Sequence, residues 1–127
     1  MLPYKWGGEK GFIKLRSDFV NNEQIKLLSN MKQLIIKYKR KFQIRPDRDY
    51  IQDLLEIGIS ESEAWNHILS LNKNFFYIDP KPTYRKNNDT LIFLKQINGI
   101  DVYIKLRIEN NIEEEVVCIS FHKSSKG

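Results

Sequence analysis

The last third of the chain is patterned with a period of two, which restricts it to a β-sheet with one buried face. Residues 91–97 and 102–108 follow this pattern. Asn98-Gly99 between them is a strong signal for a tight hairpin, because both residues tolerate a positive φ. A turn over 109–114 then leads into a third such run at 115–122. The sequence therefore predicts three antiparallel strands in succession.

The residues before this region repeat with a helical period instead. Between about 22 and 41, apolar residues recur at spacings of three and four, which predicts a first helix. A second helix is expected over 49–57, ended by Gly58. A third begins at Ser60, which has capping-box spacing to Glu63. Helices followed by strands predict an α+β fold.

The length of 127 residues corresponds to a single domain. We expect an N-terminal arm over 1–20, a helical half over 21–79 and an antiparallel sheet over 80–127. The helices would pack on one face of a sheet of three strands or slightly more. The opposite face of that sheet is then left open.

Several classes of protein are excluded by what the chain lacks. A single cysteine, Cys118, rules out an internal disulfide framework and a multi-cysteine zinc site. No apolar run approaches the roughly 18 residues of a membrane span, and the first residues lack the apolar core of a signal peptide. The acids at 113–115 are contiguous, two isolated histidines do not form a zinc site, and no phosphate-binding glycine loop is present. We therefore expect a cytoplasmic protein with no metal, no cofactor and no membrane contact.

Positive charge is concentrated in one stretch of the helical half. The chain has 21 Lys and Arg against 16 Asp and Glu, a net charge of +5. Between positions 26 and 48 the only acid is Asp47. The basic residues of this stretch are Lys26, Lys32, Lys37, Lys39, Arg40, Lys41, Arg45 and Arg48. Such a patch either supplies the sequence-independent part of nucleic-acid binding or is a solvated helix face.

The alternation of side chains along a strand sorts the residues of the last two strands onto two faces. The set expected to meet the helices is Val102, Ile104, Leu106, Ile108, Val117, Ile119 and Phe121. The set expected on the open face is Tyr103, Lys105, Arg107, Cys118, Ser120 and His122. On this assignment His122, Tyr103 and Lys105 lie close together.

That group has the chemistry for cleaving RNA without a metal. His122 can take or give a proton near neutral pH, and Lys105 can stabilise charge on the phosphate. Tyr103 can orient a hydroxyl group or stack on a base. The alternative is an ordinary solvated sheet face. The other histidine, His67, falls on the third helix, where packing is the commoner role.

Four motifs, taken in order, resemble a known family. They are LLEIGIS at 54–60, ILSL at 68–71, VYIKLRI at 102–108 and EVVCISFHK at 115–123, with a Pro-containing basic loop between the first two and the last two. From about residue 30 to 123, roughly three quarters of the chain, this arrangement resembles the motility quorum-sensing regulator (MqsR) family of toxins, which have a RelE-like fold.

The resemblance implies an mRNA endoribonuclease held inactive by a cognate antitoxin protein from a neighbouring gene. Tyr103 falls on the family's active-site tyrosine, and His122 falls where the family has a lysine. Two other family positions differ, since the lysine after Tyr77 is Ile78 here and the glutamine of the first strand falls on Phe93. The residues that could take over those two roles are Arg85 or Lys86 for the lysine, and Gln96 or Lys95 for the glutamine.

The sequence thus predicts a metal-independent endoribonuclease toxin of a type II toxin–antitoxin pair that cleaves mRNA. The alternatives are a non-catalytic nucleic-acid-binding regulator and a phage-type protein-interaction module. The expected catalytic residues are His122, Tyr103 and Lys105. The residues expected to bind RNA are Arg85, Lys86, Lys95, Gln96, Arg107, Lys39, Arg40 and Lys41.

Overall fold

The computed structural model describes residues 13–14, 22–78 and 89–124 of the chain. Most of the expected arm, the basic loop with Arg85 and Lys86, and the last three residues therefore lie outside the described residues. The elements, in chain order, are β1 (Ile13–Lys14), α1 (Asn22–Ile36), β2 (Arg40–Phe42), α2 (Tyr50–Ile57), α3 (Glu61–Leu69), the 3₁₀ turn η2 (Lys73–Phe75), β3 (Tyr77–Ile78), β4 (Thr90–Ile97), β5 (Ile100–Asn110) and β6 (Glu114–Lys123).

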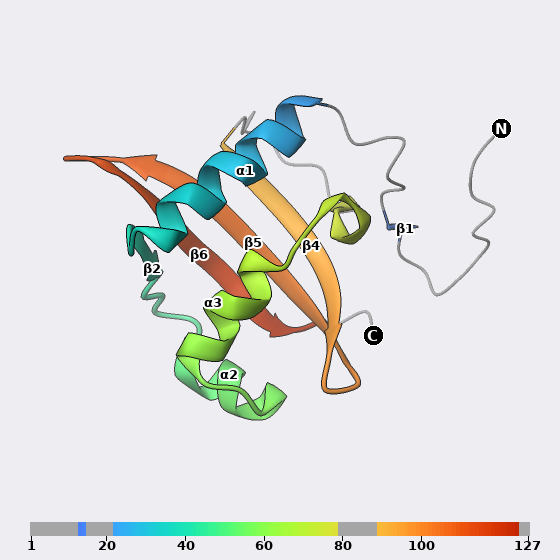
Figure 1. Cartoon of the computed structure of the whole chain (residues 1–127). Coiled ribbons are helices and arrows are strands. Elements are labelled where there is room, and N and C mark those ends of the chain that lie inside the picture. Colours follow the sequence, from blue (N-terminus) through green and yellow to red (C-terminus); the bar gives the residue numbers. More distant parts are fainter. Residues whose placement is uncertain (1–12, 15–21, 79–88, 125–127) are drawn as a thin grey trace, which may run out of the picture.

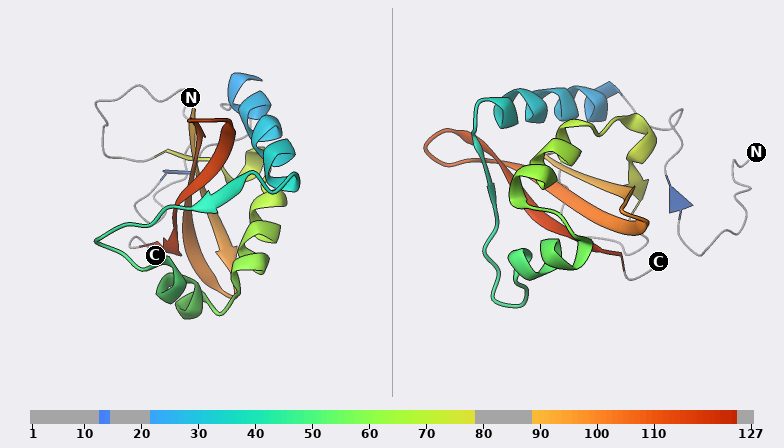
Figure 2. Two further views of the ribbon diagram at one scale, coloured as in Figure 1. Left: turned by 90° about the vertical axis from the view of Figure 1, so that its left-hand side faces the viewer. Right: turned by 60° about the horizontal axis from the view of Figure 1, so that its bottom comes forward.

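The protein has an α+β fold in which helices precede a four-stranded sheet. The strand order is β2-β6-β5-β4, and a second pair, β1 and β3, runs antiparallel beside it. Helices α1 and α3 cover one face of the sheet (Figure 1). Seen edge-on in the left view of Figure 2, the loop between β2 and α2 passes to the opposite side. Within the described ranges, no helix combines the length and apolar character needed to cross a bilayer.

The sheet is mixed, because the first helix ends early and leaves residues 40–42 free to form a strand. We expected a helix to residue 41 and a wholly antiparallel sheet. Instead α1 ends at Ile36, and Tyr38 adopts a left-handed conformation with φ 63° that turns the chain back. Phe42 can then be buried, and β2 pairs in parallel with β6. The helical period continued into β2 only because a three-residue strand is too short to show its own period.

The helix ends follow the local signals in the sequence. Asp49 is the N-cap of α2, and its side chain accepts a hydrogen bond from the amide of Ile51. Gly58 ends the same helix with φ 90°, where a Cβ would be strained. Ser60 and Glu63 form the predicted reciprocal capping box at the start of α3.

The predicted hairpin joins β4 to β5. Asn98 and Gly99 have φ 53° and 78°, as a two-residue type I′ turn requires. The Asn98 side chain also donates a hydrogen bond of 2.9 Å to the carbonyl of Ile57, at the end of α2. The hairpin tip is therefore fixed to the helical layer, which fixes the register of the sheet beneath the helices.

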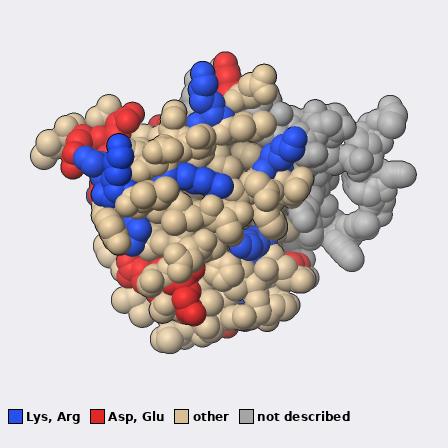
Figure 3. Space-filling view, in the orientation of Figure 1, with Lys and Arg blue, Asp and Glu red and all other residues tan. Residues whose placement is uncertain are grey.

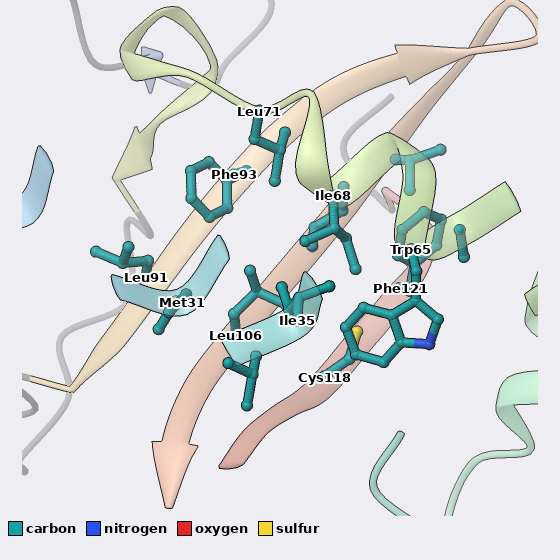
Figure 4. Close-up of a cluster of buried hydrophobic side chains, with 14 of the residues drawn as sticks. Met31, Ile35, Trp65, Ile68, Leu71, Leu91, Phe93, Leu106, Cys118 and Phe121 are labelled. Carbon is teal, nitrogen blue, oxygen red and sulfur yellow. The ribbon is translucent and has the colours of Figure 1, made fainter. Parts of the chain in front are cut away.

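The core lies between the sheet and the helices. Figure 4 shows Met31 and Ile35 of α1 and Ile68 of α3 packed against strand side chains. The strand residues labelled there are Leu91, Phe93, Leu106, Cys118 and Phe121. All of these side chains are buried, at most 3 % exposed.

A β-bulge in β6 changes which residues face the core. Lys105 lies opposite Ser120, but the next residue, Leu106, lies opposite Cys118, so Ile119 is an extra residue. The expectation that Cys118 faces outward is therefore wrong, since it is buried with the core cluster. Val117 and Ile119 are likewise absent from that cluster, and Val117 lies opposite Arg107 instead. Beyond the bulge, the expected alternation of the strand holds.

Candidate functional site

The face of the sheet turned away from α1 and α3, for which we keep the name open face, brings the three expected catalytic residues together. It is less exposed than expected, because Tyr103, Lys105 and His122 are only partly exposed and their neighbours Leu94, Val117 and Ser120 on this face are buried. Tyr103 lies directly opposite His122, and Lys105 lies opposite Ser120. The rings of Tyr103 and His122 are stacked, with centroids 5.5 Å apart and planes 21° apart. Tyr77 meets the ring of Tyr103 edge-on, at 6.1 Å. A row of three rings therefore crosses this face.

The hydrogen bonding of His122 determines which ring nitrogen carries the proton. Its Nδ1 lies 2.9 Å from the carbonyl oxygen of Lys123, which can only accept, so Nδ1 donates. In the neutral ring, Nε2 then holds the lone pair. Burial lowers the pKa of His122, and the charges of Arg48 and Arg45 lower it further. The hydrogen bond to Lys123 and the charge of Asp53 act in the opposite direction, but the net effect is a lowered pKa. His122 is thus set up as a neutral base at pH 7.

Two arginines from the loop between β2 and α2 approach this face. Arg45 donates hydrogen bonds to the Ser120 hydroxyl at 3.2 Å and to Asp47. Arg48 donates two to Asp53 of α2, at 2.8 and 3.3 Å. A crevice beside them has a volume of about 10 Å³, room for one water but not for a nucleotide.

The sequence predicted no role for Arg45 and Arg48 beyond membership of the basic stretch between positions 26 and 48. Nothing local in the sequence links position 45 to position 120, because that contact depends on how β2 pairs with β6. The one usable signal was the spacing of acids beside them. Asp47 and Asp53 follow the arginines closely enough to hold their side chains.

Of the residues expected to bind RNA, Lys95 is on the other side of the sheet. It has the same strand parity as the buried Phe93, and its Nζ lies 2.7 Å from the Ser70 hydroxyl and 3.1 Å from Nδ1 of His67. Gln96 has the opposite parity and donates a hydrogen bond to Asp101. Of the two candidates for the glutamine role, Gln96 alone therefore shares a face with Tyr103.

Arg107 is on the open face but away from His122. It lies opposite Val117, beyond the bulge, and donates a hydrogen bond to Glu109 at 2.9 Å. The family's glutamine position, Phe93, is fully buried and packs on Phe76 with ring centroids 4.8 Å apart. A side chain at position 93 therefore cannot contact RNA in this fold.

The basic triplet at 39–41 is not gathered at the site. Lys39 forms an ion pair with Glu113, and Lys41 lies 3.5 Å from Glu115. On the helix-covered face in Figure 3, Lys and Arg side chains are scattered, and a basic group at its edge borders acidic ones. Lys39 and Lys41 are therefore paired with carboxylates at the β5–β6 turn and at the start of β6, away from His122.

Arg40, the middle residue of that triplet, has a structural role. Its Nη1 donates to the carbonyl of Ile35 at the end of α1, at 3.1 Å. Its guanidinium also stacks on the rings of Tyr38 and Trp65, at 4.4 and 5.3 Å from their centroids. Arg40 thus stabilises the left-handed turn that ends α1.

The described residues do not assemble an alternative metal or thiol site. Among them, no three His, Cys, Asp or Glu side chains converge to hold a metal ion. The thiol of Cys118 is buried in the core, and burial raises its pKa far above the physiological range. The part of the chain that the structure describes therefore offers neither a cluster of metal ligands nor an accessible thiol.

Both histidines should make the folded state less stable in mild acid. Burial lowers the pKa of His67 and of His122, so the unfolded chain binds more protons below about pH 6.5. This stability is present above that pH and is lost as the pH falls through the folded-state pKa values. Protonating His67 would also set two cations 3.1 Å apart, because Lys95 donates to it. Urea unfolding at pH 7.5 and pH 5 should show the loss, and His67→Gln should reduce it. An unchanged pH dependence in that variant would contradict this account.

Comparisons with protein-family models, with curated proteins and with solved structures gave no match. The resemblance to the MqsR toxins therefore rests on the motifs quoted above.

Proposed function

We propose that this protein is an endoribonuclease that cleaves RNA at the open face of the sheet, without a metal. The observation that carries the proposal is the stacked pair of His122 and Tyr103, with Nε2 of His122 left as a base. Among the described residues, Nε2 has no hydrogen-bond partner. Lys105 is on the same face, and Arg45 is bonded to its neighbour Ser120.

In this reaction Nε2 of His122 takes the proton from a ribose 2′-hydroxyl. The 2′-oxygen then forms a bond to phosphorus, and the bond from phosphorus to the 5′-oxygen breaks. Lys105 stabilises the negative charge that grows on the phosphate and supplies a proton to the leaving oxygen. Tyr103 holds the His122 ring by stacking. The products are a 2′,3′-cyclic phosphate and a 5′-hydroxyl.

The resemblance to the MqsR toxins adds a substrate and a partner to this proposal. The MqsR-like motifs favour mRNA as the substrate and a cognate antitoxin as the inhibitor. Ile51 and Leu55 are one turn apart on α2, and both are more than half exposed. They offer a partner protein an apolar contact beside Arg48, from which it could extend over the open face.

A cleavage assay on the purified protein tests the proposal. Short single-stranded RNA incubated in EDTA should be cut to a 2′,3′-cyclic phosphate and a 5′-hydroxyl. The same oligonucleotide with a 2′-deoxyribose at the cut site should stay intact. RNA that is bound but not cut would favour the non-catalytic regulator, and absence of both would favour the protein-interaction module.

A further inference from the structure

Arg48 is held outward by a carboxylate that is itself buried. Its Nε and Nη2 donate to the two oxygens of Asp53, whose side chain is only 11 % exposed, whereas that of Arg48 is 40 % exposed. A guanidinium has five N–H groups, and this pair uses two of them. The remaining N–H groups, including both on Nη1, have no partner among the described residues. The side chain is therefore oriented but not saturated.

Arg45 differs in that four of its five N–H groups are already bonded. Nε and Nη2 bind Asp47, and Nη1 binds the Ile119 carbonyl and the Ser120 hydroxyl. Arg45 and Arg48 also form an isolated antiparallel bridge. Arg45 thus ties the loop to β6 at the bulge, and the bridge fixes Arg48 beside it. Arg45 is a positioning residue, and Arg48 has the donors left for a ligand.

Arg48 reaches the side of the sheet that carries His122 through the same loop as Arg45. Ser120, which accepts a hydrogen bond from Arg45, lies two residues before His122 in β6 and on the same face of the sheet. Arg48, Asp53 and Ser120 line one crevice, which places the Arg48–Asp53 pair beside this part of β6. Around this point three cations, Arg45, Arg48 and Lys105, face two carboxylates. The balance is one positive charge, which favours an anion over a cation.

We propose that Arg48, held by Asp53, binds a phosphate group beside His122. That this phosphate is a phosphodiester of RNA rests on the function proposed above, whereas the binding of phosphate itself does not. Arginine suits this role because its planar fork can bind one oxyanion with two parallel hydrogen bonds. Because Asp53 fixes the fork, little side-chain freedom is lost on binding.

Titration of the full chain with inorganic phosphate tests this site directly. Binding would be followed by NMR through the Nε–H signal of Arg48 and the ring signals of His122. Wild type should show saturable shifts at both residues. Arg48→Gln should weaken binding by about 10- to 100-fold, the size of one charge-assisted hydrogen-bond pair. Lys73→Gln, which removes an exposed charge on η2, is the matched control and should bind as wild type does.

Two further variants guard against a folding defect, since Arg48→Gln leaves the Asp53 carboxylate unpaired. Arg48→Lys keeps a positive charge but lacks the fork, and Arg48→Gln/Asp53→Asn removes both charges. Both should fold, as judged by thermal unfolding, and both should bind phosphate more weakly than wild type. Unchanged phosphate affinity in the folded variants would overturn the site.

RNA cleavage by the same variants separates this site from the nuclease proposal. Arg48→Lys should also cut RNA at least tenfold more slowly than wild type. Phosphate binding that depends on Arg48, in a wild-type protein that cuts no RNA, would support the site and remove the nuclease. If Arg48→Lys instead cuts RNA and binds phosphate as wild type does, the nuclease proposal stands and the Arg48 site is removed.

Discussion

Replacing His122 with alanine is expected to lower the rate of RNA cleavage by roughly 10²- to 10⁴-fold, the usual size of a general acid–base contribution. His122 is the residue whose Nε2 is left as a base on the open face. The fold should survive, because His122 is half-buried at the end of β6 and outside the core cluster. RNA affinity should change little, since the base acts on the bound 2′-hydroxyl. Single-turnover cleavage and equilibrium binding of a 2′-deoxy analogue would measure the two effects separately.

His67→Ala is the matched control for this experiment. It removes the other histidine, which is on α3 at the helix-covered face and bonded to Lys95. Its cleavage rate should match that of wild type at pH 7.5. Tyr103→Phe keeps the stacked ring and should cost less than His122→Ala. A folded His122→Ala protein that cuts RNA at the wild-type rate would defeat the assignment.

Replacing Phe93 with alanine should reduce the free energy of unfolding by about 3–5 kcal/mol, the usual cost of deleting a buried aromatic ring. Phe93 is fully buried in the middle of β4, and its ring packs against Phe76. The cavity would open between the sheet and the helices, where neighbouring strands restrict collapse. Urea denaturation followed by circular dichroism would measure the loss.

Ile112→Ala serves as the control for Phe93, because Ile112 is fully exposed in the β5–β6 turn. Its effect should stay within about 0.5 kcal/mol. Phe93→Gln introduces the side chain that the MqsR family has at the corresponding position. It should also destabilise the protein, because the amide would be buried without a hydrogen-bond partner. A loss below about 1 kcal/mol in both Phe93 variants would show that β4 is not fixed in this register.

Several parts of the fold could be predicted because their causes are local. Asn98-Gly99 selects a tight hairpin through the backbone freedom of two residues. Ser60 and Glu63 begin α3 because each side chain accepts a hydrogen bond from the other's backbone amide. Gly58 ends α2 because it has no Cβ and adopts the left-handed conformation without strain. These causes act over three or four residues and do not depend on the rest of the chain. The same holds for the alternation that separates His122 from Phe121.

Other parts depended on partners far away in the sequence. Residues 40–42 are a strand because β6 offers a free edge and a site for Phe42, and neither is visible in the local pattern. The bulge at Ile119 shifted the alternation by one residue, so Cys118 was assigned to the wrong face. A period of two in the sequence does not show where a bulge inserts an extra residue.

The candidate site divides in the same way. The strand period alone placed Tyr103, Lys105 and His122 on a common face, because two neighbouring antiparallel strands carry them in phase. Only the tertiary structure added Arg45 and Arg48, since the path of the loop after β2 sets which face it crosses. It also moved Lys95 to the helix side, where the end of α3 supplies its polar partners. Local patterns thus determined which side chains share a strand face, whereas long-range pairing decided which charges meet them there.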